Sequence, residues 1–369
     1  METHDITVIG GGLVGSALAL GLAEAGQRVL VLDGEDLARR ASRANFGLVW
    51  VSGKGLGAPD YARWSFESAR LWPGFARDLE ARSGVSLALD QPGGYSFALS
   101  PQELDGIVTD MTRITEETGG DGAPWRLVPR AELEREIPGI GPDVAGAVHG
   151  SADGHLNALR LFHALHRAGA AAGVTYRARH TVSHIEPGAE SFRLRGDWGE
   201  ITTPRVVLAA GTATEALAPM VGLAAPLKHS RGQIVVTERV SGRLPFLSAI
   251  IRQTDEGSVM IGDSDEGDTE ALSGNPEIAA LLGARAIRVY PALARLNVVR
   301  SWTGFRVKPR DGIPIYGQST SCPGAYVVLC HSGVTLAAQH ALRIAPQIAA
   351  GAAQIGPSAF SSARFHVPA

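Results

Sequence analysis

The feature that most constrains the fold is a glycine-rich turn between two short apolar segments near the start of the chain. The mostly apolar run ITVI at 6–9 predicts a short buried strand, and so does VLVL at 29–32. Between them, the Ala- and Leu-rich pattern of Leu13–Ala25 predicts a helix that ends at Gly26. The start of the chain is therefore predicted to form a βαβ unit with two parallel strands.

The turn itself has the sequence GGGLVG, which fits the pattern G-x-G-x-x-G. Gly10 is expected to make the tight turn, Gly12 to let a diphosphate approach the backbone, and Gly15 to let the helix pack closely on the strand. The N-terminus of the helix offers unpaired N–H groups and a partial positive charge to the same anion. These requirements predict a dinucleotide site, to which Leu13 and Val14 also belong.

Asp33 follows the second predicted strand and is followed in turn by Gly34. Its carboxylate can accept hydrogen bonds from ribose hydroxyls and would repel a 2′-phosphate. Asp33 and Gly34 are therefore predicted to contact the nucleotide, which would be FAD or NAD(H) rather than NADP(H). The motif alone does not distinguish FAD from NAD, and both alternatives stay open at this point.

The rest of the chain alternates between helical and strand patterns. Residues 33–59 are polar and rich in glycine, which predicts a long loop, and such a loop is more often functional than idle. Helical patterns occur at 62–83, 101–119, 157–173, 276–290 and 335–351. A continuous apolar run predicts a buried strand at 325–330, and another strand is predicted at 201–210, ending at Gly211. Alternating runs predict half-exposed strands at 94–99, 232–240 and 258–262.

Composition argues against several classes of function. The net charge of −3 gives no sign of a site for nucleic acid or for an anionic membrane. The two cysteines, Cys322 and Cys330, are too few for an iron–sulfur cluster, which needs about four thiolates, and they do not form a C-x-x-C metal pair. No apolar run approaches the roughly 20 residues of a membrane span, and no signal peptide is visible. We expect a cytoplasmic protein without a metal site.

Further motifs follow the βαβ unit in order along the chain. They are ASRANFGLV at 41–49, VVLAAGT at 206–212, GFR at 304–306, DGIPIYG at 311–317 and HSGVTLA at 331–337. Together they resemble the D-amino-acid oxidase superfamily of FAD enzymes. The longer run NFGLVWVSGK at 45–54, Trp72–Pro73 and HSGVTLAA at 331–338 are similar to the flavin β subunits of opine and D-hydroxyproline dehydrogenases and of hydrogen cyanide synthase.

The predicted buried strands lie near both ends of the chain and in its middle, and the alternating strands fill the gaps. This arrangement and the resemblance predict an α/β fold with two domains. The first is a Rossmann-like FAD-binding domain assembled from three segments, 1–84, 145–225 and 300–369. The second is an interrupting α+β substrate-binding domain, built on a mostly antiparallel sheet from 85–144 and 226–299.

The resemblance also implies roles for individual residues. Arg306 would bind a substrate carboxylate through two parallel N–H donors, and His331 would belong to the same catalytic site. The N–H groups that follow His331 would face the pyrimidine edge of the flavin, where negative charge grows on reduction. The residues expected to contact FAD, besides those of the βαβ unit and Arg306, are Ser42, Arg43, Asn45, Gly47, Leu48, Ala210, Gly211, Gly304, Ser332, Gly333, Val334, Thr335 and Leu336.

Simpler interpretations of these residues stay open. Arg306 could form an ion pair with solvent-exposed groups, and residues 331–336 could be an ordinary turn and helix cap. Lys54 is predicted to be a solvated lysine, with a role at flavin N5 or at the substrate as the alternative. His155 is predicted to have a structural role first and a place near the substrate second. Some relatives attach the flavin covalently through a cysteine in the segment around Gly304, but neither cysteine lies there, so non-covalent FAD is expected.

We therefore expect an FAD-dependent oxidoreductase that oxidises the C–N bond of an amino acid, an imino acid or a secondary amine such as an opine or D-hydroxyproline. The hydride would pass to flavin N5. The resemblance implies a subunit of a dehydrogenase. Because this chain lacks iron–sulfur ligands, the electrons would then leave through a partner subunit that carries an iron–sulfur centre or a second flavin. One alternative is a self-contained glycine, sarcosine or D-amino-acid oxidase that makes hydrogen peroxide. Two others are an NAD-dependent dehydrogenase and a non-catalytic flavin-binding subunit.

Overall fold

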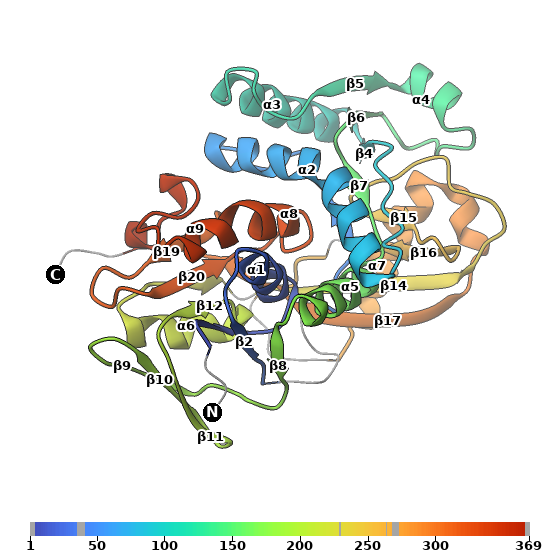
Figure 1. Cartoon of the computed structure of the whole chain (residues 1–369). Coiled ribbons are helices and arrows are strands. Elements are labelled where there is room, and N and C mark those ends of the chain that lie inside the picture. Colours follow the sequence, from blue (N-terminus) through green and yellow to red (C-terminus); the bar gives the residue numbers. More distant parts are fainter. Residues whose placement is uncertain (1–3, 35–40, 229, 263, 268–272, 366–369) are drawn as a thin grey trace.

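A computed structural model describes residues 4–34, 41–228, 230–262, 264–267 and 273–365 of the chain. Its central element is a six-stranded sheet, in which all strands but one edge strand are parallel (Figure 1). The spatial order is β19 (Ile315–Gln318), β20 (Ala325–Leu329), β12 (Val206–Leu208), β1 (Ile6–Ile9), β2 (Val29–Leu32) and β8 (Thr175–Arg177). The antiparallel strand is β19, which pairs with β20.

The helices of the described residues are α1 (Leu13–Glu24), α2 (Pro59–Ser83), α3 (Pro101–Glu117), α4 (Arg130–Glu136), α5 (Ala158–Ala171), α6 (Thr214–Leu217), α7 (Pro276–Val289), α8 (Ala337–Gln339) and α9 (Ala345–Ala349). A π-helical turn over His340–Ile344 joins α8 to α9. None of the helices in the described part of the chain is long and apolar enough to cross a membrane.

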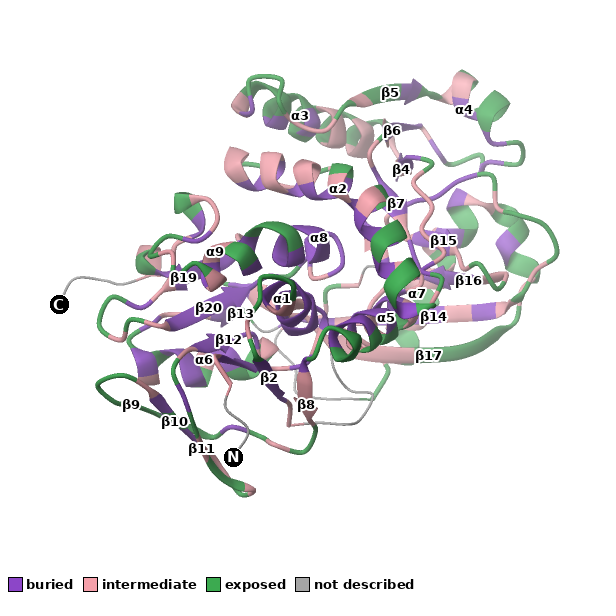
Figure 2. Ribbon diagram, viewed as in Figure 1, coloured by how far each residue is buried: buried purple, intermediate pink, exposed green. Residues whose placement is uncertain are grey.

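The central sheet is covered on both faces, and Figure 2 shows its strands as mostly buried except the edge strand β8, which is intermediate. On one face, Val8 packs with Leu18 of α1 and Ile344 of the π-helical turn. On the other face, Ile9 packs with Leu194, which lies in a three-stranded antiparallel sheet. That small sheet consists of β9 (His184–Pro187), β10 (Phe192–Gly196) and β11 (Gly199–Thr203). Alternate residues of one strand thus enter two separate cores, as expected for a buried parallel sheet.

A second group of antiparallel sheets lies beside the central one (Figure 1). One sheet has the order β15 (Ile251–Gln253), β16 (Ser258–Ile261), β14 (Arg231–Arg239) and β17 (Val298–Phe305), and α7 contacts β14 and β16. Another has the order β4 (Gly94–Ala98), β6 (Gly146–Gly150) and β5 (Trp125–Pro129). Two short pairs complete the set: β3 (Leu48–Val49) with β7 (Gly154–His155), and β13 (Leu227–Lys228) with β18 (Lys308–Pro309).

The predicted α/β class and the parallel strands of the βαβ unit are confirmed, with β1 and β2 paired in parallel over their full length. The predicted strand at 201–210 is wrong as a single element. It forms two strands, β11 and β12, which belong to different sheets. Pro204 lies between them, and a proline cannot donate a hydrogen bond to a continuous ladder. The chain therefore changes sheets at this residue.

Several strands have no clear sequence pattern. The longest of them is β17, whose first four residues are exposed because it is the edge strand next to β14. The predicted loop at 33–59 contains the short strand β3, and residues 35–40 of that loop lie outside the described residues. The predicted C-terminal helix begins two residues later than expected, at Ala337, and contains the π-helical turn.

The division into two domains stays a prediction. The strands of the central sheet come from the three segments assigned to the FAD-binding domain. However, β6 begins at Gly146 and pairs with β4 and β5, and β17 reaches Phe305 while paired with β14. A domain boundary near residue 145 or 300 would therefore separate strands that are hydrogen-bonded to each other in these two sheets.

The close approach of Gly15 to Gly10 in the βαβ unit leads to a first prediction. A Cβ atom at Gly15 would lie 1.8 Å from the carbonyl oxygen of Gly10, so helix and strand cannot keep their spacing with a larger residue. We expect Gly15→Ala to lower the free energy of unfolding by about 1–3 kcal/mol, the usual cost of overpacking. Denaturant unfolding measures this change.

Gly74→Ala is the matched control, because Gly74 lies in α2 and a Cβ there would meet nothing within 4 Å. Alanine is the better helix former, so we expect this variant to be unchanged or more stable by about 0.5–1 kcal/mol. Equal effects of the two substitutions would contradict the steric explanation.

Candidate functional site

A cavity of about 980 Å³ lies at the carboxyl ends of the parallel strands. Its wall includes the residues that follow β1, β2, β12 and β20, where open α/β sheets bind their ligands. The predicted site residues on its wall are Gly10, Gly12, Leu13, Val14, Asp33, Gly34, Ser42, Asn45, Leu48, Ala210, Gly211, Gly304, Arg306, His331, Ser332, Gly333, Val334 and Thr335. The structure thus gathers distant segments around one space.

Four predicted residues do not line the wall but support it. Gly15 packs α1 against the turn, as described above. Gly47 has a φ of +86°, and a Cβ there would lie 2.5 Å from the carbonyl oxygen of Leu156. Arg43 lies over the ring of Phe162 instead, with 5.5 Å between the guanidinium carbon and the ring centroid. Leu336 is fully buried in a core cluster.

The glycine turn forms a cradle that only glycine can form. Gly10 has a φ of +104°, and a Cβ there would lie 2.4 Å from the carbonyl oxygen of Ala209. The turn is further held by Ser16, whose hydroxyl donates to the carbonyl oxygen of Gly11 at 3.0 Å. Without side chains at Gly10 and Gly12, a ligand in the cavity can approach the backbone of the turn closely.

The N-terminus of α1 opens directly onto this cradle. Gly12 is the N-cap and makes no side-chain capping hydrogen bond, while the Leu13 N–H donates to the hydroxyl of Ser42 at 2.9 Å. A Cβ at Gly12 would lie 2.9 Å from the same hydroxyl. The first turn of a helix has N–H groups without intrahelical partners, and these suit a diphosphate. The residues of the cradle therefore fit the diphosphate of a dinucleotide.

Asp33 and Gly34 form one end of the cavity. A carboxylate oxygen of Asp33 accepts a hydrogen bond from the Gly11 N–H at 2.5 Å, so the residue ties the end of β2 to the glycine turn. A Cβ at Gly34 would lie 2.5 Å from the hydroxyl of Thr181, which also lines the cavity. Asp33 is the only carboxylate among the described residues of the wall. This end has the chemistry expected for the adenosine half of the ligand.

Arg306 and His331 lie together on another part of the wall. Arg306 donates to the carbonyl oxygen of Ser264 at 2.6 Å and to Nε2 of His331 at 3.4 Å. The surrounding protein and then the guanidinium of Arg306 lower the pKa of His331 well below its usual value, although the ring is exposed on the cavity side. His331 is therefore neutral at pH 7, and Arg306 carries the positive charge of the pair.

The prediction that Lys54 is a solvated lysine is wrong. Its ammonium group lines the cavity and donates to the hydroxyl of Ser332 at 2.6 Å and to that of Thr335 at 3.2 Å. Burial lowers its pKa to about 8. The sequence offered one signal, since the chain has only three lysines and this one is the last residue of the motif at 45–54. A loop pattern does not show which way a side chain points.

The turn that binds Lys54 is itself fixed by α2. Ser332 forms a hydrogen bond with the hydroxyl of Tyr61 at 2.7 Å. The carbonyl oxygen of Thr335 accepts from the hydroxyl of Ser68 at 2.6 Å and from the indole of Trp72 at 3.0 Å. These three residues of α2 are buried. The turn before α8 is therefore rigidly placed on the cavity wall, as a site that orients a cofactor ring requires.

The Asp-Gly-His turn supports the loop that carries Lys54. Asp153 is fully buried and accepts from the N–H groups of Val51 at 2.6 Å and Ser52 at 3.1 Å, and also from the hydroxyl of Ser52. Burial raises its pKa to about 6. His155 does not line the cavity and instead contacts the buried guanidinium of Arg252 at 3.2 Å. Asp153 is a positioning residue that sequence reasoning missed.

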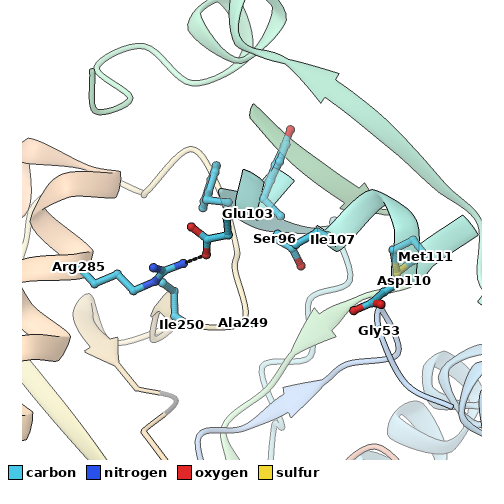
Figure 3. Close-up of a pocket in the computed structure, with 11 residues that line it drawn as sticks. Gly53, Ser96, Glu103, Ile107, Asp110, Met111, Ala249, Ile250 and Arg285 are labelled. Atoms are coloured by element: carbon cyan, nitrogen blue, oxygen red, sulfur yellow. Dashed lines mark hydrogen bonds and ion pairs between the residues drawn. The ribbon is translucent and has the colours of Figure 1, made fainter. Parts of the chain in front are cut away.

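A smaller cavity of about 260 Å³ adjoins the large one (Figure 3). Ser96 and Ala249 line both cavities, and Gly53, next to Lys54, lines the smaller one. Glu103 and Arg285 form an ion pair on its wall. The loop of Gly53 and Lys54 therefore contributes to the walls of both cavities.

Comparison with known proteins places the chain in a family. Residues 5–346 match the family described as FAD dependent oxidoreductase, so the chain belongs to that family. The chain is 55% identical to a subunit of opine oxidase from Rhizobium meliloti over 365 residues, which cover 99% of this chain and 98% of that protein. It is 26% identical to the HcnC subunit of hydrogen cyanide synthase from Pseudomonas aeruginosa, with 89% and 88% of the two chains covered.

The crystal structure of glycine oxidase from Geobacillus kaustophilus has the same fold. The two chains superpose with a TM-score of 0.89 over 100% of each chain, at 23% sequence identity. The family assignment confirms FAD as the cofactor, in place of the NAD alternative. The resemblance to the D-amino-acid oxidase superfamily and to the opine and cyanide synthase subunits is likewise confirmed.

The chain's own residues provide what a flavin site needs. FAD, when bound, accepts the hydride and its two electrons from the substrate. The glycine cradle and Ser42 would hold the diphosphate, and Ser332–Thr335 would orient the ring. Arg306 would bind and align an anionic substrate group. Because His331 is neutral, the pair of Arg306 and His331 has a single positive charge, which belongs to Arg306. No three His, Cys, Asp or Glu side chains of the described residues gather closely enough to hold a metal ion.

The buried ammonium of Lys54 leads to a prediction about stability. Its pKa in the folded chain, about 8, is below its ordinary value of 10.5, so the unfolded chain binds more protons between these values. The stability of protein freed of FAD should therefore rise with pH from about 8 to 10.5. Lys54→Met should remove this rise and make the protein more stable at pH 7 by about 1–3 kcal/mol, since a tenfold change in proton affinity is worth about 1.4 kcal/mol.

Urea unfolding of FAD-free protein between pH 6 and 10.5 measures this effect. Lys228→Met is the control, because Lys228 is exposed on β13 and does not line the cavity. A Lys54→Met variant that is less stable than wild type at pH 7 would show that the hydrogen bonds of Lys54 outweigh its burial.

Proposed function

We propose that the chain oxidises the C–N bond of an opine, a secondary amine that carries carboxylates, as the flavin subunit of a larger dehydrogenase. The observation that carries this proposal is the 55% identity to the opine oxidase subunit of Rhizobium meliloti over nearly the full length of both chains. The cavity wall supports it, because Arg306 and Lys54 place positive charge on a wall whose only described carboxylate is Asp33. Such a wall suits an anionic substrate.

Arg306 is proposed to bind a substrate carboxylate. Its guanidinium is planar and can donate two parallel hydrogen bonds to a carboxylate, which a lysine cannot do. Its hydrogen bonds to the Ser264 carbonyl oxygen and to neutral His331 hold the guanidinium on the cavity wall. A carboxylate bound there would align the amine of the substrate for hydride transfer.

FAD is proposed to bind without a covalent bond. Cys330 lines the cavity, but burial raises the pKa of its thiol to about 12, so it stays protonated and is a weak nucleophile. Cys322 does not line the cavity. Two thiols also cannot hold an iron–sulfur cluster, so we propose that electrons leave through a partner subunit with an iron–sulfur centre or a second flavin. The cytoplasm remains our prediction for the compartment.

A self-contained oxidase that produces hydrogen peroxide is the second candidate. The fold shared with glycine oxidase of Geobacillus kaustophilus keeps it open, since the flavin could react with oxygen directly. A glycine or D-amino-acid substrate would then replace the opine. The two candidates differ in the electron acceptor, which a simple assay distinguishes.

We predict that the purified chain, mixed with opines in the absence of oxygen, loses the visible absorbance of its oxidised flavin. In air, an opine should reduce an added dye acceptor at least about tenfold faster than oxygen. Spectrophotometry and an oxygen electrode measure the two rates. Peroxide formed in a 1:1 ratio to oxidised amine, at a rate equal to dye reduction, would favour the oxidase instead.

Arg306→Lys should weaken opine binding by about 10- to 100-fold, because a charge-assisted hydrogen bond is worth about 1.5–3 kcal/mol. The dissociation constant comes from the anaerobic titration of flavin absorbance. Arg310→Lys is the matched control, since Arg310 is exposed and does not line the cavity. Wild-type affinity in Arg306→Lys would contradict the proposed role of Arg306 while leaving the FAD site unaffected.

A further inference from the structure

We propose that Lys54 is a catalytic residue whose ammonium group stabilises the negative charge that reduction adds to the flavin ring. This inference rests on the assignment of FAD to the large cavity and goes beyond the proposed substrate. The sequence analysis favours a solvated lysine over a role at the flavin, whereas the hydrogen bonds of the ammonium group indicate a role at the flavin.

The position of the ring follows from the chemistry of the cavity wall. The glycine cradle at Gly10–Gly12 suits the diphosphate, and Asp33 and Gly34 close the end suited to ribose. The ring half of the dinucleotide must then extend away from Asp33, along the wall formed by Trp50, Lys54 and the turn before α8. Lys54 therefore faces the redox-active half of the ligand.

The ammonium group of Lys54 makes no ion pair in the described part of the chain. Its hydrogen-bond acceptors are the neutral hydroxyls of Ser332 and Thr335. Asp153, the carboxylate whose charge favours the protonated lysine, has its oxygens bound to the N–H groups of Val51 and Ser52 and to the hydroxyl of Ser52. Lys54 is partly buried, and a partly buried cation without a bonded anion costs stability unless a ligand supplies the anion.

The hydrogen bonds of Lys54 do not themselves require a charge. Its ammonium group lies on the turn that leads into α8 and donates to the hydroxyls of Ser332 and Thr335. Two hydroxyl hydrogen bonds could be made equally well by an uncharged amide. A charge in this position is therefore explained better by an anion that is present only when the site is in use.

Reduction of the ring supplies such an anion. FAD, when bound, would accept the hydride of the substrate C–H bond together with its two electrons, and the neutral amine would become an imine cation. The ring, neutral before this transfer, would then have one negative charge. The ammonium group of Lys54 stays protonated throughout and offsets this charge, in the way that fixed cations stabilise charge that develops during a reaction. Lys54 thereby favours the reduced state of FAD.

The test is the reduction potential of the FAD-loaded chain, measured by dye equilibration without any amine. Lys54→Met should lower the equilibrium constant for reduction at least tenfold at pH 7, which moves a two-electron potential about 30 mV more negative. Lys54→Arg retains the charge and should stay within threefold of wild type, as should the control Lys228→Met on exposed β13. An equal loss in Lys54→Arg, or a wild-type potential in Lys54→Met, would overturn the proposal.

The pH dependence of the wild-type potential tests the same idea without substitution. Reduction should raise the proton affinity of Lys54, so the potential should fall more steeply with pH above about 8, where the oxidised form loses this proton. Four other titratable groups lie near Lys54. The pKa of Asp153 is about 6 and that of Cys330 about 12. The pKa of Tyr61 is raised above its ordinary value, and that of His331 is lowered.

These neighbours titrate outside the range from pH 8 to 10, so a steeper segment there belongs to Lys54. Its absence in wild type would overturn the proposal even if Lys54→Met failed to fold. The outcome is also separate from the proposed substrate. A chain whose flavin no opine reduces, but whose potential depends on Lys54, would contradict the opine assignment and support the role of Lys54.

Discussion

The contact on which the rest of the structure depends is the packing of α1 against its own glycine turn. Gly15 lies so close to the carbonyl oxygen of Gly10 that no side chain fits between them. A Cβ at Gly10 would in turn lie 2.4 Å from the carbonyl oxygen of Ala209, which follows β12. These contacts bring the N-terminus of α1 to the carboxyl edge of the sheet. The segments from the middle and the end of the chain then meet at this edge, through β12 and β20.

The cavity formed there combines a rigid wall with positive charge. The turn before α8 is held by buried side chains of α2, and the loop of Lys54 is held by Asp153. Two cations, Lys54 and Arg306, lie on this wall. We expect the partial burial of the Lys54 ammonium group to lower the stability of the empty chain and the charge of the reduced ring to offset this cost. The diphosphate of FAD is expected at the glycine turn and a substrate carboxylate at Arg306.

The local pattern of the first 33 residues was enough to predict the βαβ unit, because few other folds place a glycine turn and a helix between two short apolar strands. The ordered motifs then brought most of the wall residues into one predicted site. The edge strand β17 was not predicted, because apolar and polar residues do not alternate in its exposed half. Lys54 and Asp153 were missed for another reason. Their roles depend on contacts across more than 100 residues, Lys54 with Ser332 and Asp153 with Val51.

The most direct test of the central claim is an experimental structure of the chain with FAD bound. We predict density for the diphosphate at Gly10–Gly12, the adenine end beside Asp33 and Gly34, and the ring against Ser332–Thr335 with the Lys54 ammonium group within hydrogen-bond distance of it. FAD bound in the opposite direction, or at a different place from the cavity that these segments share, would contradict the assembly of the site described above.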